Sequence, residues 1–321
     1  MASPPSPETP GVDRRPRVIV NPKAGGGLSQ KKWARLVGAV SEGLGELEVQ
    51  FTEAPGHATE LAREAALHRR PLVVAFGGDG TISEAAAGLL SAREAGAADT
   101  DLGIIPRGTG GDFRRTLELP QDVAQAARHL KDATARVIDA GRVTYTLAEG
   151  GTGTRPFINV ASFGFSSAVA ERANNSSKSM GAKTAFLGAT LKTLAVYQNT
   201  DVLLELDGAP AVRRTLMLAA IGNGRFFGGG MKICPDAQLD SGNLTMVTVG
   251  DLGRLKVLTN LHKLFAGTHL TIDDVHAFQV HRVRVTPADA SAVIPVELDG
   301  ETPGQLPATF EVLPRALRLR F

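Results

Sequence analysis

Leu72-Val73-Val74-Ala75-Phe76-Gly77-Gly78-Asp79-Gly80-Thr81 joins five apolar residues to a glycine-rich polar turn. The apolar run has no polar alternation, which is typical of a strand that is buried on both faces of a sheet. Glycine lets the backbone come close to a ligand, and a helix that begins after such a turn offers N–H groups and the positive end of its dipole to an anion. The stretch therefore predicts a buried parallel strand that ends in an anion-binding turn.

The same pattern occurs twice more in the N-terminal part of the chain. The run Arg17–Val20 leads into Asn21-Pro22-Lys23-Ala24-Gly25, and Leu102–Ile105 leads into Pro106-Arg107-Gly108-Thr109-Gly110-Gly111-Asp112. In open parallel sheets, ligands bind beyond the carboxyl ends of the strands, which is where all three turns fall. Three such turns predict a site for a polyphosphate such as a nucleotide, and we expect ATP.

The segments between these strands have helical patterns. Ser29–Gly43 carries apolar residues at helical spacing, and His57–Arg69 is rich in alanine and free of glycine and proline. Leu47–Thr52 alternates and predicts a further strand, and Thr81-Ile82-Ser83-Glu84 matches a capping box at the start of a helix. Alternating strands and helices with unbroken apolar strands predict an α/β domain whose parallel sheet is covered on both faces.

From about Arg142 the pattern changes to strand-like runs with few helices between them. These runs are Val143–Leu147, Phe157–Val160, Val202–Leu206, Thr215–Ile221, Leu244–Val249, Phe278–Val285 and Val293–Leu298. Two helical stretches, Lys183–Tyr197 and Leu252–Phe265, interrupt them. The second half is therefore predicted to be a mainly antiparallel β-sandwich.

We expect three regions in the chain: a disordered tail at residues 1–15, a nucleotide-binding α/β domain at 16–141 and a β-rich substrate domain at 142–321. The tail begins with proline and serine instead of a basic start and an apolar segment, so a secretory signal is not expected. The last strand-like run, Ala316–Phe321, leaves open a return toward the boundary near Gly141.

Composition narrows the class of protein. The 321 residues carry a formal net charge of +2, which is too small for a nucleic-acid-binding face but compatible with an anionic membrane surface. A single cysteine, Cys234, excludes an intramolecular disulfide and a cysteine-based metal site, and makes a cytoplasmic location the expected one. No apolar run approaches the roughly 20 residues of a transmembrane helix.

Further motifs follow the three turns along the chain. They are Phe157-Ile158-Asn159-Val160-Ala161-Ser162-Phe163-Gly164, Pro235-Asp236-Ala237-Gln238-Leu239-Asp240-Ser241-Gly242 and Leu298-Asp299-Gly300-Glu301. In this order and at these spacings the motifs resemble the catalytic domain of the diacylglycerol kinase family, specifically the soluble bacterial lipid kinases, which are relatives of sphingosine and ceramide kinases. The resemblance covers about residues 15–321. It implies a first domain similar to those of NAD kinase and phosphofructokinase.

The resemblance also implies which residues bind ATP: those of the turns and of the helix after the second turn, together with Thr52. They are Asn21, Pro22, Lys23, Ala24, Gly25, Thr52, Gly77, Gly78, Asp79, Gly80, Thr81, Ile82, Ser83, Gly108 and Thr109. A glycine-rich turn of this kind could equally be a tight strand-to-helix connection, so this assignment depends on the resemblance.

An acid within a phosphate-binding turn points to a divalent cation, and we expect Mg²⁺ near Asp79 and Asp112. The chain departs from the family pattern at two positions. Gly111 stands where the family usually has asparagine, and Ser241 stands where it commonly has a second acid. A second Mg²⁺ site at Asp240 and Ser241 is therefore left open.

The turn Asp299-Gly300-Glu301 carries the predicted catalytic groups. By resemblance, Asp299 or Glu301 is the general base that accepts the proton of the substrate hydroxyl. A carboxylate suits this role because the alcohol loses its proton late in a loose phosphoryl-transfer transition state. Asp-Gly is also a strong signal for a two-residue hairpin turn, and the two interpretations are compatible.

These observations together predict an ATP- and Mg²⁺-dependent kinase that phosphorylates the hydroxyl of a membrane lipid, with diacylglycerol as the expected acceptor. We expect a cytoplasmic protein, peripheral at the inner face of the membrane and without a nucleic-acid partner, and a homodimer stays open. The glycine- and phenylalanine-rich segment Gly222–Met231 is predicted to be a wall of the lipid pocket. The alternatives are a kinase of a soluble alcohol, similar to NAD kinase, and a non-catalytic nucleotide-binding regulator.

Overall fold

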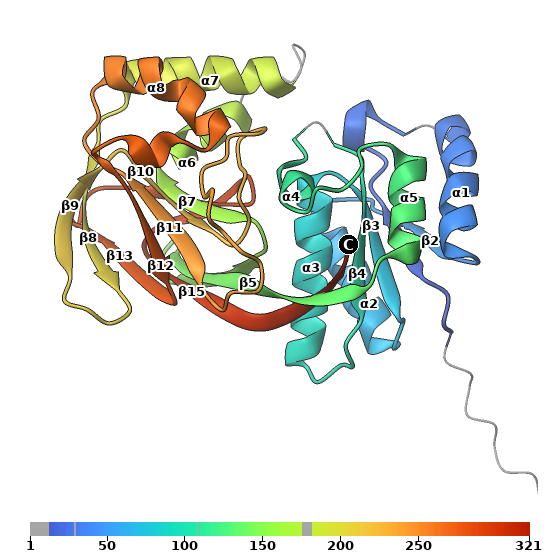
Figure 1. Ribbon diagram of the computed structural model, residues 1–321. Helices are drawn as coiled ribbons and strands as arrows, with labels where there is room; N and C mark the ends of the chain where they lie inside the picture. The colour runs from blue at the N-terminus through green and yellow to red at the C-terminus, as the bar shows by residue number, and fades with distance from the viewer. Residues whose placement is uncertain (1–12, 29, 109, 175–181) are drawn as a thin grey trace, which may run out of the picture.

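One continuous hydrogen-bonded sheet runs through both lobes of the molecule (Figure 1). The structure is a computed structural model that describes residues 13–28, 30–108, 110–174 and 182–321. The sheet order is β12-β11-β10-β7-β14-β15-β4-β3-β1-β2, with further strands paired at the side of this path. Of the predicted tail at residues 1–15, residues 1–12 lie outside the described part of the chain.

The N-terminal lobe is an α/β layer structure built on four parallel strands. They are β1 (Arg17–Val20), β2 (Glu48–Phe51), β3 (Leu72–Gly77) and β4 (Asp101–Pro106). One face is covered by α1 (Gln30–Leu44) and α5 (Val123–Asp132), and the other by α2 (His57–Leu67) and α3 (Asp79–Glu94). The strands β1, β3 and β4 are fully buried, which agrees with their unbroken apolar sequences.

The C-terminal lobe is a mainly antiparallel β-sandwich, as predicted. One layer contains β7 (Val160–Gly164), β10 (Leu218–Gly222), β11 (Leu244–Val249), β12 (Val275–Val280) and β14 (Pro295–Leu298). The other contains β5 (Ala135–Thr146), β6 (Thr152–Phe157), β8 (Thr200–Leu206), β9 (Val212–Leu216), β13 (Arg282–Pro287) and β15 (Glu301–Arg320). Apolar side chains from both layers form the core between them.

Helices cover the outer face of the first of these layers. They are α6 (Phe165–Asn174), α7 (Ala182–Val196) and α8 (Arg254–Ala266), and they gather at one end of the lobe in Figure 1. A separate apolar cluster joins this sheet face to the three helices; it includes Val160, Val169, Leu218 and Leu252. Helix α6 is not predicted from the sequence, because its alanine- and serine-rich stretch has no clear apolar stripe.

The strands β5 and β15 connect the two lobes (Figure 1). Their antiparallel pairing runs from Gln305–Thr146 to Arg320–Ala135, with irregularities between Gln305 and Ala308 and between Leu313 and Leu317. The end of β15 then pairs in parallel with β4 of the first lobe. The predicted domain boundary at Gly141 falls inside the unbroken strand β5. A side chain there would collide with the ring of Phe157, so packing explains this glycine.

Three local predictions are wrong in an informative way. Thr215–Ile221 is two strands, because the Met217 N–H bonds to the carbonyl groups of Val249 and Gly250 and the chain changes layers there. Phe278–Val285 is also two strands, because the Asp207 carboxylate accepts the N–H groups of the residues at the bend. The predicted capping box is absent: α3 begins at Asp79 after Gly78, so Thr81 lies inside the helix.

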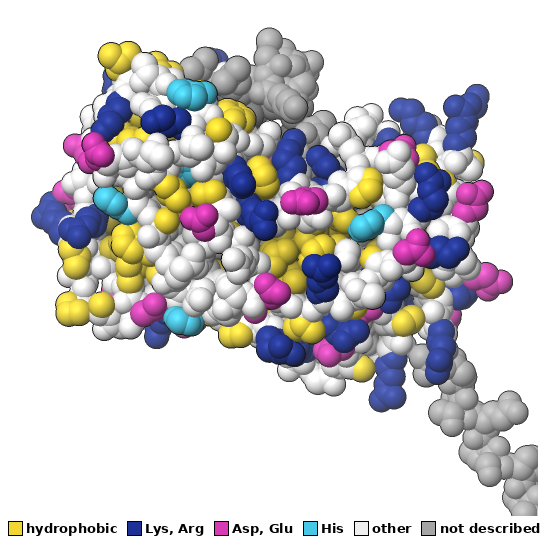
Figure 2. Space-filling view, viewed as in Figure 1, with side chains coloured by type: hydrophobic (Ala, Val, Ile, Leu, Met, Phe, Trp, Pro, Cys, Tyr) yellow, Lys and Arg dark blue, Asp and Glu magenta, His cyan; other side chains and the backbone are white. Residues whose placement is uncertain are grey.

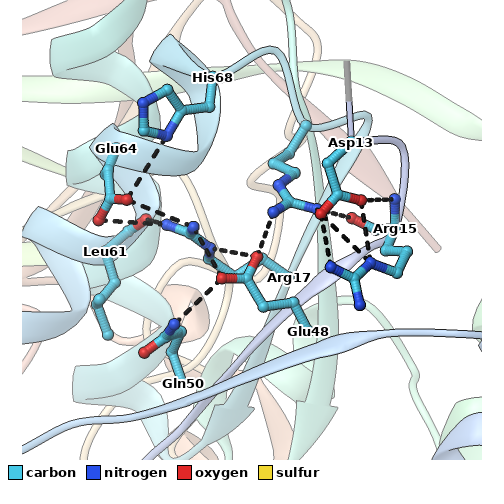
Figure 3. A network of polar contacts seen from close by, with 9 residues as sticks. Asp13, Arg15, Arg17, Glu48, Gln50, Leu61, Glu64 and His68 are labelled. Carbon is cyan, nitrogen blue, oxygen red and sulfur yellow. Dashed lines mark hydrogen bonds and ion pairs between the residues drawn. The ribbon is translucent and has the colours of Figure 1, made fainter. Parts of the chain in front are cut away.

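The amino ends of β1 and β2 are held by a network of charged side chains (Figure 3). The guanidinium of Arg17, only 4% exposed, bonds to both carboxylate oxygens of Glu48 at 3.1 and 3.0 Å and to the Leu61 carbonyl at 3.2 Å. Arg70 pairs with Glu48 at 2.6 Å and with Asp13 at 2.5 Å. The network ties the start of the described chain, β2 and α2 together, at the edge of the sheet opposite the glycine turns.

We expect Arg17→Met to lower the free energy of unfolding by roughly 2–4 kcal/mol, because it removes a donor from a buried ion pair. Arg213→Met is the matched control, since Arg213 pairs with Asp201 at the surface with 69% of its side chain exposed. We expect Arg213→Met to lower the free energy of unfolding by less than about 0.5 kcal/mol. Urea denaturation of both variants is the measurement, and equal losses would contradict a structural role for the network.

Candidate active site

The three glycine turns lie together at the carboxyl edge of the parallel strands and are bonded to each other. The side-chain amide of Asn21, after β1, donates to the Thr81 hydroxyl in α3 at 3.0 Å. The carboxylate of Asp79 accepts the N–H of Gly111, in the turn after β4, at 2.7 Å. The predicted nucleotide-binding residues thus come from separate strands and meet at one place.

Arg107 joins the turn after β4 to the turn after β1. Its guanidinium donates to the carbonyl groups of Ala24 at 2.6 Å and Gly27 at 2.9 Å, and its N–H donates to the Gly77 carbonyl at 2.6 Å. No role is assigned to Arg107 from the sequence. Its position inside the third turn is the signal that could have identified it.

One glycine of the turns, Gly108, is required by close backbone contact. A Cβ on Gly108 would lie 2.8 Å from the Cα of Gly78, which is closer than real side chains approach. A Cβ on Gly78, whose φ is −89°, would lie 3.6 Å from the Gly108 Cα, so neither a clash nor a left-handed backbone requires glycine at that position. The turns after β3 and β4 therefore touch backbone to backbone, and they leave little side-chain bulk at the surface of the site.

The other predicted nucleotide-binding residues surround this point. Pro22, Lys23, Ala24 and Gly25 form the turn after β1, and the Thr52 N–H bonds to the Val20 carbonyl at 2.9 Å just after β2. Gly80, Ile82 and Ser83 lie in the first turns of α3. Thr109 lies outside the described residues.

A cavity of about 580 Å³ lies next to the turns, in the C-terminal lobe. The sheet face of β7, β10 and β11 forms one wall, and α6, α7 and α8 form the other. Most of its lining is apolar, for example Val160, Val169, Leu218, Leu261 and Phe265. Its volume is in the range of small-molecule sites, and its walls suit an apolar ligand.

The predicted wall segment Gly222–Met231 contributes to this cavity. Phe227, Gly228, Gly229 and Met231 are among the lining residues. Phe227 and Met231 exchange backbone hydrogen bonds at 3.0 Å, which closes the segment into a tight loop. The Gly229 N–H then donates to the carboxylate of Asp112 at 2.8 Å, so the loop is attached to the first lobe.

One end of the cavity is acidic. Asp79, Asp112, Glu297 and Asp299 all line it there, and Asp79 also belongs to the glycine turns. Asp112 is 7% exposed, and burial raises the pKa of its carboxyl, with a further contribution from the charge of Asp79. The apolar cavity and the predicted nucleotide turns therefore meet at a group of carboxylates.

Asp299 holds the two lobes together at this point. Its carboxylate accepts the Ser83 hydroxyl of α3 at 2.7 Å and the N–H groups of Ile158, Asn159 and Val160 at 3.1–3.2 Å. Burial raises the pKa of the carboxyl. The hairpin prediction is confirmed, because Leu298 pairs with Glu301 across Asp299 and Gly300, which have φ values of 47° and 95°.

The structure separates the other predicted catalytic and metal residues from the cavity. The Glu301 carboxylate points to Arg155, with which it forms an exposed ion pair at 2.8 Å, and Glu301 is not among the residues that line the cavity. Asp240 and Ser241 are exposed in a loop whose Gly242 N–H bonds to Asp139. In the described part of the chain, no three His, Cys, Asp or Glu side chains gather in a way that could hold a metal ion.

Glu297 is the acidic residue that sequence reasoning missed. It is 6% exposed on β14, and its carboxylate accepts the Ser162 hydroxyl and the Gly300 N–H. Burial raises the pKa of Glu297 to about 7, and the charges of Asp299 and Asp112 add to the shift. An acid between two apolar residues of a predicted strand could have drawn attention to it.

Comparison with known proteins identifies the family. Residues 15–143 match the model of the diacylglycerol kinase catalytic domain, and residues 159–321 match the YegS C-terminal NAD kinase beta sandwich-like domain. The diacylglycerol kinase of Mycobacterium tuberculosis (strain ATCC 25618 / H37Rv) is 31% identical over 304 residues, which are 94% of this chain and 93% of the relative. The chain belongs to the diacylglycerol kinase family of lipid kinases.

Two further similarities extend over nearly the whole length of this family member. The diacylglycerol kinase of Bacillus subtilis (strain 168) is 29% identical over 307 residues, which are 95% of this chain and 96% of the relative. A crystal structure of a Bacillus anthracis protein assigned to the diacylglycerol kinases superimposes with a TM-score of 0.75 at 25% identity, covering 96% of this chain and 97% of that one. The resemblance seen in the sequence is therefore confirmed.

The raised pKa of Glu297 predicts a pH-dependent stability for this lipid kinase. The pKa rises from an ordinary value of 4.5 to about 7 on folding, so the folded state favours the neutral carboxyl. This stabilisation is complete below about pH 4.5 and is lost as the pH rises through about 7. The amide of a Glu297→Gln variant stays neutral at every pH, so we expect this variant to gain stability relative to wild type between pH 5 and pH 8. Urea denaturation at both pH values tests this, and a difference that does not change with pH would contradict it.

Proposed function

We propose that the protein is an ATP- and Mg²⁺-dependent lipid kinase that transfers the γ-phosphate to the hydroxyl of a membrane lipid, with diacylglycerol as the acceptor. The observation that carries this proposal is the meeting of an apolar cavity with the glycine turns at four carboxylates. A lipid needs an apolar cavity, and a polyphosphate needs exposed backbone N–H groups. The site offers both on opposite sides of the acidic group.

The turns fit the triphosphate of ATP. Backbone contact between Gly108 and Gly78 leaves no side chain where phosphates would approach, and α3 begins at Asp79 with the positive end of its dipole toward the turns. Kinases of this family use a nucleotide as phosphate donor, and these features support ATP as the donor here. Asn21 and Arg107 would keep the turns in place around the phosphates.

The donor set fits Mg²⁺ as this ion is usually bound beside phosphates. Mg²⁺ is commonly held by one or two carboxylates together with substrate phosphates and water, not by a cage of protein side chains. Asp79 and Asp112 provide two carboxylates, and the described residues contain no larger group of ligands. When bound, the ion would neutralise charge on the phosphates. The exposed loop at Asp240 and Ser241 is not part of this set.

The acceptor hydroxyl would lie at the acidic end of the cavity, with the lipid chain along the apolar walls. The general base is expected among the carboxylates there. Of the two residues named by resemblance, Asp299 lines the cavity, and Glu301 is paired with Arg155 outside it. The apolar lining argues against a soluble alcohol as acceptor, and the convergence of carboxylates argues against a purely regulatory protein.

Helix α8 supports a contact with the membrane at the mouth of the cavity. Leu258 and Phe265 line the cavity but are also 47% and 53% exposed, and Leu255 beside them is 75% exposed. In Figure 2, hydrophobic side chains reach the surface at the end of the lobe where Figure 1 places α8. Arg254, Lys256 and Lys263 belong to the same helix. No helix among the described residues is long and apolar enough to cross a bilayer. An interfacial helix would let a lipid pass from the membrane into the cavity.

Phosphate transfer from radiolabelled ATP to lipids in mixed micelles tests the proposed function. We expect turnover with diacylglycerol, loss of turnover when Mg²⁺ is chelated, and no turnover with soluble alcohols such as NAD. Phosphorylation of a soluble alcohol alone would establish the competing enzyme function, and nucleotide binding without any transfer would establish the regulator.

Gly108→Ala tests the nucleotide site. The new methyl group would lie within 2.8 Å of the Gly78 backbone, so the turns must separate. We expect ATP affinity to fall by about tenfold or more, which corresponds to about 1.4 kcal/mol. Gly38→Ala on α1 is the control, because a Cβ there meets nothing within 4 Å. Calorimetric titration with ATP is the measurement, and unchanged affinity in a folded Gly108→Ala protein would remove the turns from the site.

Replacing Leu255 and Phe265 by serine tests the membrane contact. Both side chains are more than half exposed, so the double variant should fold normally. We expect weaker sedimentation with vesicles that contain anionic lipid, at low salt, because apolar area at the interface is lost. Val293→Ser is the control, since Val293 is 69% exposed outside α8. If the double variant and the Val293→Ser control sediment equally well, α8 is not the part of the protein that contacts the membrane.

A further inference from the structure

The cavity of the C-terminal lobe has one acidic end, and the rest of its wall is mostly apolar. Side chains from the sheet and from all three helices form the apolar part: Val160, Leu218, Val169, Leu194, Leu261 and Phe265. The acceptor hydroxyl belongs at the acidic end, beside the glycine turns. The apolar part is therefore left for the hydrocarbon of the lipid, and its capacity decides how much of the lipid the protein can enclose.

Polar side chains within the apolar part have partners inside the protein. The side-chain amide of Asn159 donates to the Phe226 carbonyl at 2.9 Å. The Nε2–H of His269 donates to the Ile233 carbonyl at 3.0 Å, and burial lowers the pKa of this imidazole, which favours its neutral form. This part of the wall therefore suits hydrocarbon and not a second polar group.

The volume of the cavity limits how much hydrocarbon it can hold. An apolar cavity of about 150 Å³ in a protein interior binds benzene, which is roughly 25 Å³ for each carbon atom. At this ratio the cavity of about 580 Å³ holds roughly 23 carbon atoms. One long acyl chain together with a glycerol group fits this volume, whereas the two long chains of a diacylglycerol exceed it.

The walls leave little freedom for the cavity to widen. On the sheet side, β10 is paired on both edges, with β7 and with β11. The loop that contains Phe227 and Met231 is attached to the first lobe by the bond from the Gly229 N–H to Asp112. On the helix side, Val169 and Leu194 belong to the apolar cluster that packs on the sheet. A second chain would have to break these contacts to make room.

We propose that the cavity holds one acyl chain of the acceptor, so that lipid alcohols with a single chain, of the monoacylglycerol class, are substrates of this kinase. The second chain of a diacylglycerol stays outside the cavity and adds no binding inside it. This inference rests on the proposed function. The phosphate transfer is the same for both acceptors, because it involves only the hydroxyl group.

The first test compares acceptors with the wild-type protein. In mixed micelles at equal surface concentration, we expect kcat/KM for monooleoylglycerol to lie within about tenfold of that for dioleoylglycerol. A larger deficit of the single-chain lipid would show that the site requires both chains, and it would overturn the proposal.

The second test measures the contribution of the chain itself. With short-chain monoacylglycerols below their micelle concentration, we expect KM to fall about fourfold for each added methylene group, because each one is transferred from water into the cavity. Glycerol has the same hydroxyl groups and no chain, and it should not be phosphorylated. A KM that does not depend on chain length would contradict a chain-binding cavity.

The third test fills the cavity. Ala170, on α6, lines the cavity, and a phenyl ring there would occupy about 150 Å³ of it. We expect Ala170→Phe to raise the KM for the longer monoacylglycerols by about tenfold or more and to leave the KM for ATP unchanged. Ala168→Phe is the matched control, because Ala168 is a half-buried residue of the same helix that is not among the lining residues.

Val257→Phe provides the same test from α8 if Ala170→Phe does not fold, since Val257 is half-buried and lines the cavity. Unchanged chain-length dependence in a folded cavity-filling variant would place the chain elsewhere and overturn the proposal. The outcomes also separate this inference from the proposed function. If wild type phosphorylates no lipid, the proposed function is wrong. If it phosphorylates diacylglycerol but not the single-chain lipids, only the inference is wrong.

Discussion

The pairing of β5 with β15 is the constraint on which the site depends. β15 begins at the Asp-Gly turn in the sandwich, follows β5 and ends beside β4 in the α/β lobe. Backbone hydrogen bonds along two long strands fix the distance and register between the lobes. The Asp299 carboxylate consequently reaches Ser83 at 2.7 Å, although 216 positions separate them in the chain. Without this pairing, the carboxylates of the hairpin and the glycine turns would belong to two unrelated surfaces.

The cavity exists because one layer of the sandwich is buried on both sides. The inner faces of β7, β10 and β11 pack against the second layer, and their outer faces pack beneath α6, α7 and α8. The space that the helices leave is lined mostly by apolar side chains, and such surroundings raise the free energy of an ionised carboxylate. The raised pKa values of Glu297 and of Asp299 follow from the same burial.

The Asp-Gly turn combines a structural and a chemical role. Both residues need the left-handed conformation of a tight hairpin, and aspartate tolerates it better than most residues do. The same geometry turns the Asp299 carboxylate back onto three consecutive backbone N–H groups after β6. Its many hydrogen bonds make it a strong attachment between the lobes. The strand before the turn, β14, places Glu297 in the wall of the cavity.

The sequence by itself determined the α/β lobe, the sandwich, the order of the motifs and the family, because unbroken apolar strands, glycine turns and the Asp-Gly signal are local patterns. It also placed Asp79, Asp112 and Asp299 near the expected site. Only the tertiary structure decided that Glu297 is buried and that Glu301 is not beside it. Strand alternation puts Glu297 on an outer face, and whether that face meets water depends on α6, whose sequence has no distinctive pattern. Burial is a property of what packs over a residue, and segments distant in the sequence supply that cover.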